Sequence, residues 1–359
     1  MKIGIVGLPN AGKSSLFSAL TGVAAEAANY PFTTIEPNVA VVPVRDERLD
    51  AVAEVVGASK IVPDMIMFHD IAGLIAGAHR GEGLGNQFLA NIRETDAIVH
   101  VVRVHEDPNV VHPEGRVDPL ADIETIETEL IYADLEQVER RLERVSRSAR
   151  SGERRAVAEE AWLRQLIEAL QAGRPARTVP PPADAPDAQT LLQPLTAKPV
   201  LYVANVEEGS DGVPPPILEY ARSHDAAAVA VSARLEAELA ELGPEEAAAM
   251  RSELGLSESG LEAVVRGAFS LLQLLAFFTA GEDKPAQSWH LRRGLSVWHA
   301  AGMIHSDMQR GFVRAEVIPW NELVDAGGYA RARDRGTLRL EGRAYVVADG
   351  DVITVKFTP

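Results

Sequence analysis

One short segment near the start of the chain constrains the fold more than any other. The apolar run Ile3–Val6 is followed at once by Gly7-Leu8-Pro9-Asn10-Ala11-Gly12-Lys13-Ser14 and then by helix-forming residues. In a strand–loop–helix context, the pattern G-x-x-x-x-G-K-S is that of a phosphate-binding P-loop, whose backbone N–H groups point at an anion. The sequence therefore predicts an α/β nucleotide-binding fold. The residues expected around the phosphates are Asn10, Ala11, Gly12, Lys13, Ser14 and Ser15.

Three polar side chains of this loop have predicted roles. We expect Lys13 to reach the β- and γ-phosphates as a catalytic cation, and the Ser14 hydroxyl to be a ligand of Mg²⁺. Asn10 suggests K⁺ as a second ion, because related P-loops use an asparagine at this position to hold K⁺ beside the phosphates. The expected cofactors are Mg²⁺ and, as a further candidate, K⁺.

Two further motifs favour a nucleotide-dependent switch. Asp70-Ile71-Ala72-Gly73 follows the strand-like run Met65–His69, so that Asp70 can join the Mg²⁺ shell and the Gly73 N–H can reach the γ-phosphate. Between the P-loop and this motif lies Tyr30-Pro31-Phe32-Thr33-Thr34, where we expect Thr34 to be a second metal ligand. The glycine-rich segment 77–85 is typical of a loop that changes with nucleotide state.

Length and composition limit the class of protein. The 359 residues exceed what one hydrophobic core usually fills, which predicts two or three domains. The absence of cysteine excludes disulfide scaffolds, thiolate catalysis and cysteine-based zinc sites. The longest apolar stretch, residues 268–280, is too short to span a membrane, and no signal-peptide pattern precedes Ile3. We therefore expect a cytoplasmic protein without a membrane partner, and its net charge of -17 disfavours unspecific nucleic-acid binding.

The first part of the chain has the pattern of a parallel sheet. Short β-branched runs alternate with helix-like segments, which predicts a mostly parallel sheet wrapped by helices. The expected strands are Ile3–Val6, Met65–His69, Ala97–Val104, Val200–Ala204 and Ala227–Val231.

The middle of the chain predicts an antiparallel helical hairpin. Apolar residues recur with four-three spacing, as in a coiled-coil seam, and a break at Ser151-Gly152 separates them from a second helical stretch. The seam residues are Ile131, Leu135, Val138, Leu142 and Val145, followed by Leu163, Leu166 and Leu170.

Residues from about Phe277 onward predict a small mixed β domain. Short alternating runs are separated there by the turns Glu341-Gly342 and Asp349-Gly350. The predicted domains are a nucleotide-binding domain of residues 1–119 and 196–276, a helical-hairpin insert of residues 120–195, and the β domain of residues 277–359.

These motifs together carry a family resemblance. The P-loop, residues 29–38 (NYPFTTIEPN) and residues 70–74 (DIAGL) resemble the Obg-related P-loop proteins. Residues 81–86 (GEGLGN) and two C-terminal segments, 340–345 (LEGRAY) and 349–352 (DGDV), are similar to the YchF subfamily of that group. The resemblance covers essentially the whole chain. It implies a TRAFAC-class G domain with the helical insert, a C-terminal β-grasp TGS domain, and a ribosome-associated ATPase.

The segment after residues 200–204 bears on the choice of base. Ordinary GTPases carry N-K-x-D there, and the aspartate accepts hydrogen bonds from guanine N1–H and N2–H₂. This chain has Asn205-Val206-Glu207-Glu208, which lacks the lysine and carries a longer carboxylate, so we expect weak guanine specificity. The resemblance implies ATP, with Asn205 and the Val206 backbone on the base, although Asn205 as a simple turn cap stays open. The expected base pocket consists of Asn205, Val206, Glu208, Ser232, Ala233 and Arg234.

Intrinsic hydrolysis is expected to be slow. Leu74 stands where small GTPases have a glutamine that orients the attacking water. His69 and His100 are candidate replacements, because imidazole can orient water near neutral pH, although a strand histidine is more often packed in a core. The resemblance implies His100 as the catalytic residue, since the family's proposed histidine matches the stretch His100-Val101-Val102-Arg103.

Arginines gather in the predicted hairpin and suggest a partner. They could meet RNA phosphates, but interleaved glutamates leave a merely solvated helix open. The resemblance favours ribosome binding by a monomer, to the large subunit or the 70S particle, with rRNA or tRNA as candidate contacts. The alternatives are an Obg-like GTPase of ribosome assembly or translation, a metabolic P-loop kinase, and a nucleotide-gated binding module that does not hydrolyse. The arginines are Arg140, Arg141, Arg144, Arg147, Arg150, Arg154 and Arg155.

Overall fold

The computed structural model describes residues 1–26, 38–71, 84–106, 115–210, 212–256 and 259–358. These residues pack into two compact units. The first comprises residues 1–26, 38–42 and 67–271, and the second comprises residues 43–66 and 272–358, within the described ranges. In the described part of the chain, no helix is long and apolar enough to cross a membrane.

The first unit is built on a six-stranded sheet with the strand order β2-β4-β1-β5-β6-β7. The pairs of β1 with β4 and β5, of β5 with β6, and of β6 with β7 are all parallel, which confirms the predicted α/β fold. All five expected strands are present, each within one residue of its predicted bounds. The strands are β1 (Lys2–Val6), β2 (Val39–Val44), β4 (Asp64–Asp70), β5 (Ala97–Arg103), β6 (Val200–Asn205) and β7 (Ala227–Val231).

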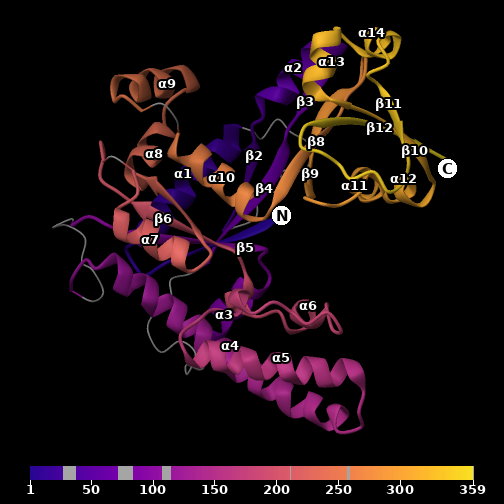
Figure 1. The fold of residues 1–359 in the computed structure, drawn as a ribbon. Coiled ribbons are helices and arrows are strands. Elements are labelled where there is room, and N and C mark those ends of the chain that lie inside the picture. The colour runs from indigo at the N-terminus through magenta and orange to yellow at the C-terminus, as the bar shows by residue number, and fades with distance from the viewer. Residues whose placement is uncertain (27–37, 72–83, 107–114, 211, 257–258, 359) are drawn as a thin grey trace. The chain divides into compact units, whose positions relative to one another are not determined.

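Helices cover both faces of this sheet (Figure 1). Successive side chains of β6 point to opposite faces of the sheet. Tyr202 and Ala204 pack in one cluster with residues of α4 (Pro119–Ala149) and α7 (Pro215–Ser223), whereas Leu201 lies against α10 (Gly260–Leu271). Every residue of β5 and β6 is buried, as expected for central parallel strands. Outside residues 119–197, the other helices of the first unit in the described part of the chain are α1 (Lys13–Glu26), α3 (Leu84–Arg93), α8 (Ala233–Leu239) and α9 (Pro244–Glu253).

The predicted helical hairpin is confirmed. It consists of α4 (Pro119–Ala149) and α5 (Arg154–Gln171), which lie side by side in Figure 1. Asp118 caps α4 by accepting the Ala121 N–H at 3.2 Å, and Pro119 sits in the first turn, where a missing N–H costs nothing. The predicted seam forms the hairpin core, and short helices follow it: 3₁₀ turns at Ala176–Thr178 and Leu195–Ala197, and α6 (Ala188–Leu192).

Buried polar contacts tie the root of the hairpin to the sheet. Asp134 of α4 is fully buried and accepts hydrogen bonds from the backbone N–H groups of Leu195 at 2.7 Å and Thr196 at 2.8 Å. The hydroxyl of Tyr202, on β6, donates to Glu127 of α4 at 2.8 Å. Burial raises the pKa of Asp134, while the hydrogen bonds that it accepts from the Thr196 hydroxyl and from the two backbone N–H groups oppose the rise. Removing the Asp134 carboxylate would leave two buried N–H groups unpaired, at about 1–3 kcal/mol each.

The second unit has a mixed six-stranded sheet with the order β11-β10-β12-β8-β9-β3. Its strands are β3 (Lys60–Val62), β8 (Leu274–Thr279), β9 (Pro285–Arg292), β10 (Phe312–Pro319), β11 (Arg339–Glu341) and β12 (Asp351–Phe357). Its helices are α2 (Glu47–Val56), α11 (Val297–Ile304), α12 (Ser306–Arg310), α13 (Trp320–Ala326) and α14 (Tyr329–Asp334). The small mixed β region predicted at the C-terminus is therefore present.

One segment of the second unit comes from the N-terminal part of the chain. Residues 43–66 contribute α2 and the edge strand β3, which pairs in parallel with β9. Arg48 of this segment bonds Asp349 at 3.0 Å, and Asp64 lies 2.6 Å from Nδ1 of His290. The predicted three-domain division assigned this segment to the nucleotide-binding domain, and sequence patterns did not anticipate its packing.

Candidate nucleotide-binding site

Two glycines shape the loop between β1 and α1. Gly7 and Gly12 have φ values of 156° and 103°, which side-chain-bearing residues rarely adopt. A Cβ atom at Gly7 would lie 2.4 Å from the carbonyl oxygen of Val101, and one at Gly12 would lie 2.3 Å from Nδ2 of Asn205. Neither position has room for a side chain, because the loop backbone packs directly against β5 and β6.

Lys13 begins α1 and keeps its ammonium group inside this loop. Nζ donates to the carbonyl oxygen of Leu8 at 2.8 Å, and the residue is buried. Burial lowers the pKa of Lys13, and the charge of Asp70 opposes this shift; burial likewise raises the pKa of Asp70, against the charge of Lys13. Lys13, the predicted phosphate-binding cation, and Asp70, the predicted carboxylate of the metal shell, are therefore close enough for each to shift the pKa of the other.

Asn205, the last residue of β6, links two loops. Its Nδ2 donates to the carbonyl oxygen of Ala11 at 3.0 Å, and its Oδ1 accepts the N–H of Ala233 at 3.1 Å. Ser232 caps α8 by accepting the N–H of Leu235. The amide of Asn205 thus joins the P-loop to the segment 232–234, which is more than the turn cap that the sequence left open.

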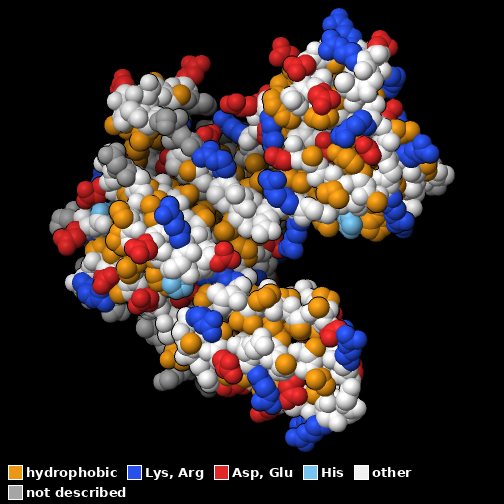
Figure 2. All heavy atoms as spheres, viewed as in Figure 1, with side chains coloured by type: hydrophobic (Ala, Val, Ile, Leu, Met, Phe, Trp, Pro, Cys, Tyr) orange, Lys and Arg blue, Asp and Glu red, His pale blue; other side chains and the backbone are white. Residues whose placement is uncertain are grey.

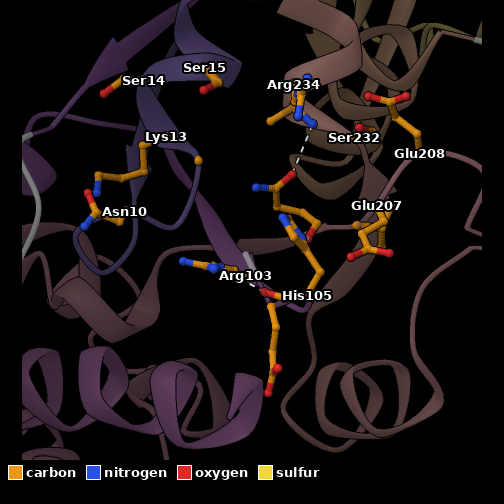
Figure 3. Close-up of a pocket in the computed structure, with 15 residues that line it drawn as sticks. Asn10, Lys13, Ser14, Ser15, Arg103, His105, Glu207, Glu208, Ser232 and Arg234 are labelled. Carbon is orange, nitrogen blue, oxygen red and sulfur yellow. Dashed lines mark hydrogen bonds between the residues drawn. The ribbon is translucent and has the colours of Figure 1, made fainter. Parts of the chain in front are cut away.

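These segments surround one cavity of about 710 Å³ (Figure 3). The P-loop forms one side, the ends of β6 and β7 form the other, and the end of β5 lies between them. The lining residues are Asn10, Gly12, Lys13, Ser14, Ser15, Arg103, His105, Glu106, Asn205, Val206, Glu207, Glu208, Ser232, Ala233 and Arg234.

The cavity brings together most of the residues predicted from the sequence. All six residues of the expected base pocket line it, as do five of the six expected phosphate-loop residues. Ala11 does not line the cavity, but its carbonyl oxygen accepts the hydrogen bond from Asn205. Asp70 borders a separate cavity of about 170 Å³. Thr34 and Gly73 lie outside the described residues, and so does Leu74.

His100 does not line this cavity. It lies in the middle of β5, is 2% exposed, and has its ring centroid 5.5 Å from that of Tyr202. Burial, reinforced by the charge of Lys13, lowers the pKa of His100 to about 3. A neutral, enclosed imidazole matches a packed core histidine, so the predicted catalytic role has no support from its position and stays a prediction.

Comparison with known proteins decides the family. Residues 2–138 match a family model described as 50S ribosome-binding GTPase, and residues 274–358 match the C-terminal model of YchF GTPases, described as a protein of unknown function. The ribosome-binding ATPase YchF of Bacillus subtilis is 48% identical over 361 residues, covering 99% of this chain and 98% of that protein. The chain belongs to the YchF family.

Other YchF proteins show the same full-length correspondence. The ribosome-binding ATPase YchF of Haemophilus ducreyi is 47% identical, with 99% of each chain covered. A solved structure of the YchF GTPase of Schizosaccharomyces pombe superposes with a TM-score of 0.88 at 34% identity, covering 99% of this chain and 97% of that chain. The nucleotide-binding sheet, the helical insert and the C-terminal mixed sheet are thus all features of the YchF fold.

Sequence patterns missed four residues that line this YchF cavity. Arg103, His105 and Glu106 follow from the C-terminal end of β5, and Glu207 lies between two residues that were predicted. Ligands of parallel α/β sheets bind at the carboxyl ends of the strands. The end of the expected strand 97–104 could therefore have indicated Arg103 and its neighbours, whereas the prediction named only His100, in the middle of β5.

The metal-binding chemistry of the site rests on oxygen atoms. In the part of the chain that the structure describes, no three His, Cys, Asp or Glu side chains cluster as a metal site would require. Ser14 supplies a hydroxyl on the cavity wall, and Asp70 supplies a carboxylate at the end of β4. Hydroxyl, carboxylate, water and phosphate oxygens are the ligands that Mg²⁺ takes in P-loop NTPases, so these residues fit that ion.

Proposed function

We propose that this chain is an ATPase that binds ATP in the 710 Å³ cavity and hydrolyses it slowly to ADP and phosphate. The observation that carries the proposal is the joining of a P-loop to Asn205-Val206-Glu207-Glu208 in one cavity, without the lysine and aspartate of a guanine site. Glu208 is exposed, which favours weak discrimination against GTP over tight guanine binding. Several relatives bear the name ribosome-binding ATPase, which supports the same conclusion.

The proposed chemistry is positioning and charge neutralisation. Lys13 and the P-loop backbone would hold the β- and γ-phosphates, and Ser14 would hold Mg²⁺, which supplies charge neutralisation when it is bound. Thr34 and Gly73 would complete this shell from segments outside the described residues. Asn10 lines the cavity beside Lys13 and is the candidate for holding K⁺, which exchange of K⁺ for Na⁺ in a hydrolysis assay tests.

GTP is the alternative substrate, since both the matching N-terminal family model and the Schizosaccharomyces pombe relative are named as GTPases. Competitive titration of the purified chain with ATP and GTP separates the two. Comparable affinities, or tighter ATP binding, support the proposal. GTP binding at least tenfold tighter than ATP binding would overturn it and leave an Obg-like GTPase of ribosome assembly or translation.

We further propose that the nucleotide state controls binding to ribosomes in the cytoplasm through the hairpin. Figure 2 shows basic and acidic side chains intermingled over this part of the molecule. Of the seven arginines between residues 140 and 155, four make ion pairs within the protein, with Glu136, Glu159, Asp184 and Asp187. Arg144 and Arg147 are exposed on α4, and neither makes an ion pair in the described part of the chain. These two are therefore better placed than Arg141, Arg154 or Arg155 to meet RNA phosphates.

Sedimentation with ribosomes tests this coupling. The chain is pelleted with 70S particles and large subunits in ATP, ADP and a non-hydrolysable ATP analogue, and pelleting should differ between nucleotides. The double variant R144Q/R147Q should pellet less and with a weaker salt dependence, whereas the matched variant R154Q/R155Q should change less, because its arginines already pair with Asp184 and Asp187. Equal pelleting in every nucleotide state would break the proposed coupling.

A further inference from the structure

Arg103 is a buried cation at the centre of the nucleotide cavity. It is the last residue of β5, is 3% exposed, and lines the cavity wall. Because β5 lies between β1 and β6 in the sheet, its end lies between the P-loop and Asn205. In the strand register Arg103 is the direct partner of Asn205, which places it at the junction of the phosphate and base sides.

The backbone after β5 fixes the position of this guanidinium group. Nε of Arg103 donates to the carbonyl oxygen of His105 at 2.9 Å. Nδ1 of His105 in turn lies 3.0 Å from the carbonyl oxygen of Asn205, and a carbonyl can only accept, so Nδ1 carries the proton. The N–H of Val104 also donates to that carbonyl, at 3.3 Å. Arg103 is therefore anchored to β6 through its neighbours.

The guanidinium group extends toward the P-loop side of the cavity. In Figure 3, Arg103 points toward the side that carries Asn10 and Lys13, whereas Glu207 and Glu208 lie on the opposite side. Arg103 and Lys13 are the two buried basic residues among the cavity-lining residues. Two buried positive charges around one cavity favour a ligand with several negative charges, and the planar fork of an arginine matches two phosphate oxygens.

We propose that Arg103 contacts the phosphate chain of the bound nucleotide and acts with Lys13 as a second fixed cation. This assignment rests on the proposed function, in which ATP occupies the cavity. It gives the site a source of charge neutralisation that belongs neither to the P-loop nor to the segment 205–208.

Binding of inorganic triphosphate, which has no base or sugar, is the decisive measurement. Arg103→Met should weaken both ATP and triphosphate by at least tenfold and reduce the salt dependence of both affinities. Arg103→Gln should also weaken both, although its amide can still donate to the His105 carbonyl, and Arg103→Lys should retain part of the affinity. Arg116→Met is the matched control, because Arg116 is an exposed residue of the same unit, paired with Asp118; it should change neither affinity more than twofold.

Two results would overturn the assignment. If both neutral variants weaken ATP but leave triphosphate unchanged, Arg103 serves the base or sugar. If thermal unfolding shows both variants folded and neither affinity changes, Arg103 has no ligand role. Failure of the proposed function can be told apart from failure of this assignment. If the parental chain binds GTP far more tightly than ATP, the proposed function is wrong, but comparing triphosphate affinity between the parental chain and the Arg103 variants still tests the role of Arg103.

Discussion

The two ends of the nucleotide cavity are built by different physical means. The phosphate end consists of backbone and buried charge: Gly7 and Gly12 leave no room for a Cβ atom, and Lys13 is buried against the Leu8 carbonyl. The base end consists largely of side chains from separate strand ends, and its carboxylates Glu207 and Glu208 are exposed.

This difference bears on specificity. A backbone nest accepts any phosphate chain and is damaged by almost any substitution, because the loop cannot yield. Exposed side chains at the base end exchange contacts with water at little cost, which is the physical basis of the weak discrimination between bases that we propose. The exception is Asn205, which is buried. Both polar atoms of its side-chain amide are hydrogen-bonded, so it holds the base end rigidly at this position.

The largest expected effect comes from Gly12→Ala. The new Cβ would lie 2.3 Å from Nδ2 of Asn205 at a φ of 103°, so the P-loop and the base segment would be forced apart. We expect nucleotide affinity to fall by at least roughly 100-fold, measured by isothermal titration with ATP. Gly209→Ala is the control, because φ there is 78° but nothing lies within 4 Å of the added Cβ. It should cost about 1 kcal/mol of folding stability and little affinity; equal losses in both variants would remove the contrast between the two ends.

Asn205→Ala should have the next largest effect. It removes two hydrogen bonds, to the Ala11 carbonyl and from the Ala233 N–H, each contributing about 0.5–1.5 kcal/mol. ATP and GTP affinities should fall together by roughly tenfold to 100-fold in competitive titrations. Asn205→Asp keeps the acceptor for Ala233 but sets a carboxylate oxygen against the Ala11 carbonyl oxygen, and two acceptors repel. Its melting temperature, measured by circular dichroism, should therefore be at least as low as that of Asn205→Ala. Loss of ATP affinity alone would show that Asn205 reads the base rather than joining the loops.

His100→Phe tests the contrast between the middle and the end of β5. The pKa of His100 is about 3 in the folded chain, against an ordinary value of 6.5, so the unfolded chain binds more protons between these values. The stabilising contribution of neutral, buried His100 is complete above pH 6.5 and is lost as the pH falls toward 3. Between about pH 7.5 and about pH 5.5 the parental chain should lose about 1.4 kcal/mol more stability than the variant, measured by urea denaturation.

Taking the difference between the two chains isolates His100. Asp70 and Asp134 have raised pKa values, which act in the opposite direction, but both residues are present in the parental chain and the variant. Identical pH profiles would show that His100 is accessible to protons in the folded state. A variant that hydrolyses ATP at the parental rate would remove the predicted catalytic role.

Glu208→Gln should have the smallest effect. Glu208 is exposed at the base end, so loss of its charge should change ATP and GTP affinities by no more than roughly threefold and shift their ratio slightly. Competitive titration with both nucleotides measures the ratio. A tenfold or greater loss of either affinity would show that the base end is as constrained as the phosphate end.

Most of the fold could be predicted because its signals are local. The P-loop follows its strand directly, and the hairpin seam repeats within one helix, with Val138 and Val145 buried as expected. The segment 43–66 could not be placed, because its three-residue strand β3 is stabilised by a parallel partner, β9, more than 200 residues away in the chain. Nothing in the sequence of so short a strand indicates which sheet it joins.

The same distinction holds within the candidate site. The sequence by itself determined the phosphate loop, because the conformation of Gly7–Ser14 depends on glycines and on a helix start that adjoin one another in the chain. Only the tertiary structure decided that Arg103 and His105 belong to the cavity and that His100 does not. Strand order places the end of β5 between β1 and β6, and that order results from long-range pairing and burial that no local pattern encodes.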